Sequence, residues 1–175
     1  MRFRILFLLL AACVLLDGAE PRLRPVTVCE VLQDLAAYDG KVVAVVGRFS
    51  FRQNGRWLGE QKCARKLVAG DQEWPNAFWI AYDPGAPKPP AVLAVDGAVL
   101  AQKLREVKLG TTLSRLPFGS TDYDNWAVVY GRVETRKDLV VATPTGTRKN
   151  GFGYGESSPA RMVCHGDAEV VFLNE

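Results

Sequence analysis

One stretch of the chain decides the fold: Lys41-Val42-Val43-Ala44-Val45-Val46-Gly47-Arg48-Phe49-Ser50-Phe51. Its β-branched residues favour a strand over a helix. The segment Val129-Tyr130-Gly131-Arg132-Val133 repeats part of its pattern: two apolar residues, then Gly, Arg and another apolar residue. A glycine inside such a strand marks a bulge or a sharp bend. Two long strands, each bent at a central glycine, indicate a small closed barrel; the alternative is a coincidence in a Val-rich chain.

The segments on either side of this strand predict further strands and two helices. Thr27 and Glu30 have the spacing of a capping box, and we expect the helix that they begin to end at Asp39-Gly40. Asn54-Gly55 is a hairpin signal that returns the chain into a second strand. A longer helix is expected from Asp96 to Lys108. The other predicted strands are residues 77–82, residues 126–134 with residues 139–143 as their hairpin partner, residues 160–164 and residues 169–173, while residues 144–158 are predicted to form a loop.

This order of strand, strand, strand, helix, strand, strand resembles an OB-fold, in which a helix lies between strands 3 and 4. The opening strand from Tyr38 to Arg48 resembles that of many OB domains. Residues 27–173 also resemble a group of small, secreted, uncharacterised bacterial proteins through Cys29, Cys63, Gly151-Phe152-Gly153 and Pro159-Ala160. The resemblance implies a mainly-β, OB-like barrel with a short N-terminal helix and one helix between strands 3 and 4. It brings no catalytic residues.

The first residues predict export. Arg2 and Arg4 precede an apolar run that Asp17-Gly18 ends too early for a membrane-spanning helix. We therefore expect residues 1–19 to be a signal peptide and residues 20–175 to be a single secreted or periplasmic domain without a transmembrane segment. The alternative is a lipoprotein anchored through Cys13, because Leu10-Ala11-Ala12-Cys13 resembles a bacterial lipobox.

Three cysteines follow the predicted signal peptide: Cys29, Cys63 and Cys164. In an oxidising compartment an odd number leaves one disulfide and one free thiol, or an intermolecular bridge. Cys29 lies on the helix before the first strand, and Cys63 follows the second strand of the same local unit. We expect these two to form the disulfide and Cys164 to remain buried and reduced.

Composition excludes several classes of function. A chain of 175 residues with 48% apolar and 23% charged residues is ordinary for one globular domain, and its net charge of +3 is too small for a dedicated nucleic-acid binder. The single histidine, His165, cannot support a histidine-rich metal site. Ser157-Ser158 lacks the Gly-x-Ser-x-Gly pattern of a nucleophile elbow, and Asp122 and Asp124 lack the pattern of a calcium loop. We expect neither a metal nor a cofactor.

The candidate binding residues surround the first hairpin. Arg52, Arg56 and Trp57 flank Asn54-Gly55, where arginine offers a planar fork to anionic groups and tryptophan a stacking surface. OB domains bind polymers in this way, along a basic groove with aromatic side chains. We expect a secreted or periplasmic, non-catalytic binding or envelope module.

The expected partners are an anionic glycan, a lipid headgroup or an envelope protein. Nucleic acid is less favoured because the chain is exported. One alternative is a hydrolytic enzyme of unknown substrate. Another is a purely structural module, in which the aromatic residues are barrel core and the cations a solvated rim.

Overall fold

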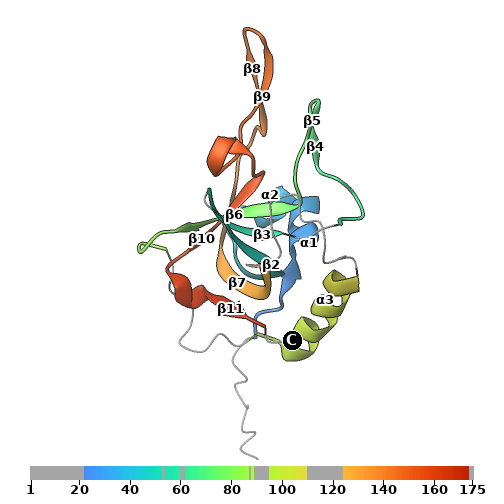
Figure 1. Ribbon diagram of the computed structural model, residues 1–175, viewed down its shortest axis with the longest axis vertical. Coiled ribbons are helices and arrows are strands. Elements are labelled where there is room, and N and C mark those ends of the chain that lie inside the picture. Colours follow the sequence, from blue (N-terminus) through green and yellow to red (C-terminus); the bar gives the residue numbers. More distant parts are fainter. Residues whose placement is uncertain are drawn as a thin grey trace, which may run out of the picture.

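The computed structural model describes residues 22–52, 54–59, 62–86, 88, 95–109 and 124–173, so the predicted signal peptide and Cys13 lie outside the described residues. Five strands form a closed barrel: β2 (Val42–Arg52), β3 (Gly55–Gly59), β6 (Ala77–Tyr82), β7 (Asp124–Thr135) and β10 (Ala160–Cys164). β2 pairs with β3, β3 with β6, β6 with β10, β10 with β7, and β7 with β2, which closes the ring (Figure 1). The fold is therefore the expected mainly-β barrel with the order β-β-β-α-β-β.

Short elements surround the barrel. Before it come β1 (Val26–Thr27), α1 (Val28–Gln33) and α2 (Leu35–Tyr38), and α3 (Gly97–Leu109) lies between β6 and β7. The hairpins β4 (Val68–Ala69) with β5 (Gln72–Glu73), and β8 (Val140–Thr143) with β9 (Gly146–Lys149), project from the same end of the barrel (Figure 1). The chain closes with the short 3-10 helices η2 (Tyr154–Glu156) and η3 (Asp167–Glu169) and with β11 (Val170–Phe172).

Two sequence predictions of local structure are wrong. The strand at residues 139–143 does not pair with β7, because β2 occupies one edge of β7 while β10 and β11 occupy the other. It pairs instead with β9, inside the segment predicted as a loop. The first helix is not continuous either: it breaks at Asp34, whose side chain accepts a hydrogen bond from the Ala37 amide and caps α2.

The hairpin between β2 and β3 forms as predicted, but its turn is displaced by one residue. Gly55 is already the first residue of β3 and pairs with Arg52. Its φ of +126° lies in a region that favours glycine. Asn54-Gly55 therefore does not form the two central positions of the turn.

The helices cover different sides of the barrel wall. Val28, Val31 and Leu32 of α1 belong to the same buried cluster as the inward-facing Val45, Phe78 and Met162. Leu100 and Leu104 of α3 pack instead against Ala44 and Val46, which point outward from β2. The N-terminal helix thus contributes to the interior core, and α3 packs against its outer wall.

Gly47 and Gly131 allow neighbouring strands to approach closely. A Cβ atom on Gly131 would lie 2.8 Å from the Val163 carbonyl oxygen, and one on Gly47 would lie 3.0 Å from the Gly59 carbonyl oxygen. Neither glycine has a positive φ. The reason for glycine at both positions is the lack of space for a side chain between adjacent strands.

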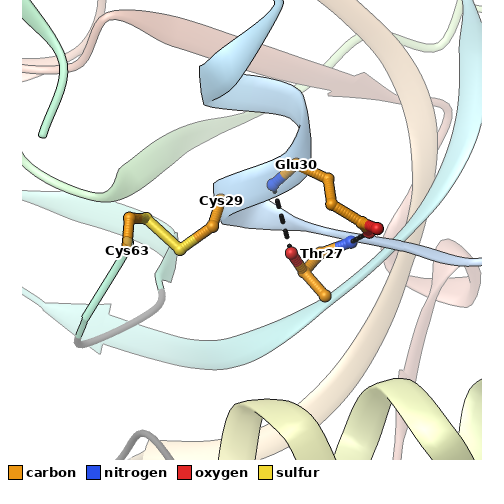
Figure 2. Close-up of a disulfide and its surroundings, with 4 residues drawn as sticks. All are labelled: Thr27, Cys29, Glu30 and Cys63. Carbon is orange, nitrogen blue, oxygen red and sulfur yellow. Dashed lines mark hydrogen bonds between the residues drawn. A yellow bond between two sulfur atoms is a disulfide. The ribbon is translucent and has the colours of Figure 1, made fainter. Parts of the chain in front are cut away.

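A disulfide joins Cys29 of α1 to Cys63, as predicted, and Cys164 is a buried free thiol (Figure 2). The predicted capping box is also present: the Thr27 hydroxyl accepts a hydrogen bond from the Glu30 amide (3.1 Å), and the Glu30 carboxylate accepts one from the Thr27 amide (2.7 Å). Glu30 in addition forms an ion pair with Lys103. The start of α1 is therefore fixed to both α3 and the segment after β3.

The crowding at Gly131 predicts a loss of stability on substitution. Gly131→Ala is expected to lower the free energy of unfolding by about 2 kcal/mol, and the melting temperature by roughly 4–8 °C, because the Val163 carbonyl must move. Gly59→Ala is the matched control, since its Cβ would lie 3.4 Å from the nearest atom. Equal melting temperatures of the two variants would contradict the packing explanation.

The disulfide predicts both a peptide pattern and a loss of stability on reduction. A non-reducing peptide map is expected to contain the Cys29–Cys63 pair, and reduction is expected to lower the free energy of unfolding by about 4 kcal/mol on the chain-entropy relation. Burial raises the pKa of the Cys164 thiol to about 12, so an alkylating reagent should modify it only after unfolding. A Cys63–Cys164 peptide would contradict the assignment.

Candidate functional site at the open end of the barrel

A pocket of about 380 Å³ lies at one end of the barrel, between the β2–β3 hairpin and β11. We call it the barrel-mouth pocket; it is lined by Phe49, Phe51, Arg56, Tyr82, Asn125, Asp167, Val170 and Phe172. These residues come from four barrel strands, η3 and β11. Most of the lining side chains are aromatic or aliphatic, which is typical of sites that bind small molecules.

Strand alternation brings the first lining residues together. Phe51 and Arg56 are direct partners across the β2–β3 ladder, and Arg56 is also opposite Ile80 of β6. Tyr82 lies two residues beyond Ile80 and therefore points to the same face of the sheet. The inner face of the barrel thus ends in two aromatic rings with a guanidinium between them.

Arg56 contacts both rings. Its guanidinium carbon lies 4.3 Å from the Tyr82 ring centroid and 5.4 Å from that of Phe51, within the range of cation–π attraction. One guanidinium nitrogen lies 3.6 Å from a carboxylate oxygen of Asp167. Burial raises the pKa of the Tyr82 phenol; Arg56 acts in the opposite direction, and a hydrogen bond to Asp167 adds to the rise. The Tyr82 hydroxyl therefore stays protonated and can donate.

The opposite wall of the pocket is apolar and partly exposed. Phe49 and Phe172 meet edge to face, with ring centroids 5.7 Å apart. Phe172 is 52% exposed and Phe51 is 54% exposed, whereas most phenylalanines of a folded domain are buried. Because these rings line a concave surface, a ligand could cover their apolar area.

The structure places two of the three binding residues predicted from the sequence, Arg56 and Trp57, and they lie on opposite faces of the sheet. Arg56 lines the barrel-mouth pocket, whereas the side chain of Arg52 lies outside the described residues. Trp57 is 2% exposed and packs edge to face against Trp79, with centroids 5.1 Å apart. It follows Arg56 directly in a strand and so points to the other face of the sheet. The expected stacking surface at Trp57 is therefore wrong.

Sequence reasoning missed the other lining residues for different reasons. Tyr82 could have been found, because it shares the parity of Phe78 and Ile80 in a strand whose inner face is apolar. Asp167 and Phe172 carry no such signal, since they reach the pocket only through the return of the chain after β10.

The Gly151-Phe152-Gly153 segment has a packing role. A Cβ on Gly153 would lie 2.3 Å from the Trp79 ring, and one on Gly151 would lie 2.7 Å from the Trp74 ring. Gly153 also has a φ of +74°. The two glycines let the backbone lie directly on the tryptophan rings. Close packing therefore accounts for glycine at both positions of this segment.

Ser158 and His165, considered for catalysis, have structural partners, whereas Asp122 and the side chain of Asp124 lie outside the described residues. Ser158 is buried; its hydroxyl accepts a hydrogen bond from the Trp79 amide and lies 2.6 Å from the Ala160 carbonyl oxygen. The His165 ring lies 3.1 Å from the Ala86 carbonyl oxygen. Within the described part of the chain, no group of three or more His, Cys, Asp or Glu side chains could hold a metal ion.

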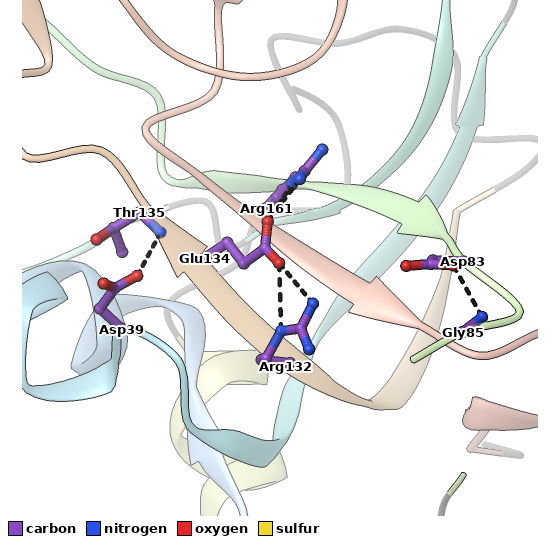
Figure 3. A network of polar contacts seen from close by, with 7 residues as sticks. All are labelled: Asp39, Asp83, Gly85, Arg132, Glu134, Thr135 and Arg161. Carbon is purple, nitrogen blue, oxygen red and sulfur yellow. Dashed lines mark hydrogen bonds and ion pairs between the residues drawn. The ribbon is translucent and has the colours of Figure 1, made fainter. Parts of the chain in front are cut away.

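A second gathering of charged side chains lies on β7 and β10, where Glu134 binds two arginines (Figure 3). One carboxylate oxygen lies 2.8 Å from an Arg132 nitrogen, and the other lies 2.6 Å from an Arg161 nitrogen. Burial alone would raise the pKa of Glu134, but these contacts outweigh it and hold the pKa below its ordinary value. Nearby, Asp39 accepts a hydrogen bond from the Thr135 amide. Both carboxylates are engaged in holding the fold.

The lowered pKa of Glu134 predicts a pH-dependent contribution to stability. Its ionised form is favoured in the folded state, so the stabilisation is present above its ordinary pKa of 4.5 and is lost as the pH falls below it. Glu134→Gln is expected to lower the free energy of unfolding by on the order of 1 kcal/mol at pH 7 and by less at pH 3. Denaturant titrations at the two pH values measure this, and an unchanged difference would contradict it.

Comparison with known proteins identifies no relative: no protein-family model, no curated protein and no solved structure matches this chain. The helices in the described ranges are too short or too polar to traverse a lipid bilayer. What the barrel-mouth pocket can bind therefore follows from its own residues.

Proposed function

We propose that this protein is an exported, non-catalytic binding module that takes an apolar ligand into the barrel-mouth pocket. The observation that carries the proposal is the half-exposure of Phe51 and Phe172 on opposite walls of one concave surface. A volume of about 380 Å³ is in the range of small-molecule sites. Filling the pocket would remove both rings from water, and this is the main source of favourable free energy that the site offers.

The charge of the lining favours a small ligand over an anionic polymer. Among the described residues that line the pocket, Arg56 is the one cation, and it already faces Asp167. Glycans and nucleic acids of high negative charge are bound by several cations along a groove. The barrel mouth has an apolar cavity instead, which fits a compact hydrophobic body.

The disulfide supports an exported protein. Disulfides persist in oxidising compartments and are rare in the cytosol. Cys29 and Cys63 are bonded, and the sequence before them has the pattern of a signal peptide. The ligand would therefore be a molecule met outside the cytoplasm.

A fluorescence titration with N-phenyl-1-naphthylamine tests the proposed function. This neutral dye becomes fluorescent in apolar surroundings, and we expect saturable binding by the purified protein at one site. Phe172→Ser should weaken binding about tenfold, which corresponds to about 1.4 kcal/mol for one lost aromatic contact.

Val171→Ser is the matched control. Val171 is a neighbouring residue on the same strand and is 41% exposed, but it does not line the pocket. It should bind the dye as the wild type does. No saturable binding, or an equal loss in the two variants, would contradict a site at the barrel mouth.

A further inference from the structure

The orientation of Arg56 leaves part of its guanidinium available to an anion. The ring centroids of Tyr82 and Phe51 lie 4.3 and 5.4 Å from its guanidinium carbon. A guanidinium stacked on aromatic rings still presents N–H donors along its edge, and these match a carboxylate or a sulfonate. The side chain is 34% exposed, so its charge lies at the boundary between the apolar cavity and water.

The Asp167 carboxylate lies beside the Arg56 guanidinium but forms no direct hydrogen bond with it. The closest approach between the two side chains is 3.6 Å, longer than a hydrogen bond, and the Asp167 side chain is 81% exposed. An ion pair with such exposure contributes little to stability. Its carboxylate is carried by η3, a helix of three residues. Asp167 thus occupies the anion position beside Arg56, and a ligand anion that replaces it there would also take over its hydrogen bond with the Tyr82 hydroxyl.

We propose that the ligand is a small apolar molecule with one anionic group, and that this group displaces Asp167 from Arg56 on binding. This inference rests on the proposed function. The single negative charge follows from the part of the lining that the structure describes, which provides one cation. The apolar body follows from Phe49, Phe172 and Val170, which form the wall beyond Arg56. Asp167 then acts as an internal competitor that lowers affinity for the anion but not for a neutral molecule of the same shape.

Two dyes with the same ring system distinguish an anion site at Arg56 from a purely apolar pocket. N-phenyl-1-naphthylamine is neutral, and 1-anilinonaphthalene-8-sulfonate adds one sulfonate to it. The wild type is expected to bind the sulfonate several-fold more tightly at low salt and to lose part of this preference at high salt. Arg56→Met keeps an apolar stem and should remove the preference, so the ratio of sulfonate affinity to neutral-dye affinity should fall several-fold to about one.

Asp167→Asn should raise the ratio of sulfonate affinity to neutral-dye affinity about threefold above that of the wild type. Asp138→Asn is the control for net charge, because Asp138 is an exposed carboxylate that does not line the pocket. Asp167 is itself largely exposed, so its variant is expected to fold even if Arg56→Met does not; thermal melts check both.

The outcomes distinguish the inference from the function on which it rests. Equal affinities for the two dyes in the wild type would overturn the anion site while leaving an apolar pocket. An unchanged affinity ratio in Asp167→Asn, or an equal gain in Asp138→Asn, would overturn the displacement. No binding of either dye would overturn the proposed function together with this inference.

Discussion

Both edges of β7 are occupied along most of its length, and the closed barrel depends on this pairing. β2 runs along one edge from Val42 to Ser50, and β10 followed by β11 runs along the other. The missing side chain at Gly131 lets β10 approach closely enough to pair. Because β11 continues along the same edge of β7 beyond β10, the chain builds a wall beyond the barrel proper. The pocket exists because this wall faces the β2–β3 hairpin.

The two faces of the β3–β6 ladder differ in how completely they are packed. Trp57 and Trp79 pack together on the outer face. Glycines of the hairpin and of the Gly151-Phe152-Gly153 segment lie against the Trp79 ring. The inner face is filled with apolar core until its last residues, where Arg56 and Tyr82 reach the open end. The first face is closely packed, whereas the second ends in the half-buried Arg56 and Tyr82, which makes this end of the barrel the candidate site.

Local patterns predicted much of the fold. The Val-rich strands, the capping box at Thr27 and the cysteine pair each depend on neighbouring residues or on one local unit, and each is confirmed. The partner of β8 could not be predicted, because it depends on strands elsewhere having filled both edges of β7. The candidate pocket could be predicted only in part: Arg56 lines it, Trp57 does not because adjacent strand residues alternate faces, and Asp167 comes from a distant part of the chain.

The disulfide gives the two walls of the pocket unequal resistance to local opening. Cys29 and Cys63 enclose β2 and β3 in one covalent loop, so the wall that carries Phe51 and Arg56 is tied to α1 even when its hydrogen bonds break. The other wall is β11, a strand of three residues that pairs within the described structure with β7 alone and lies close to the C-terminus. Partial unfolding that releases β11 and Asp167 leaves the loop-bound wall in place. The pocket therefore has one half inside the covalent loop, which holds the cation, and one half outside it, which only non-covalent contacts keep in place.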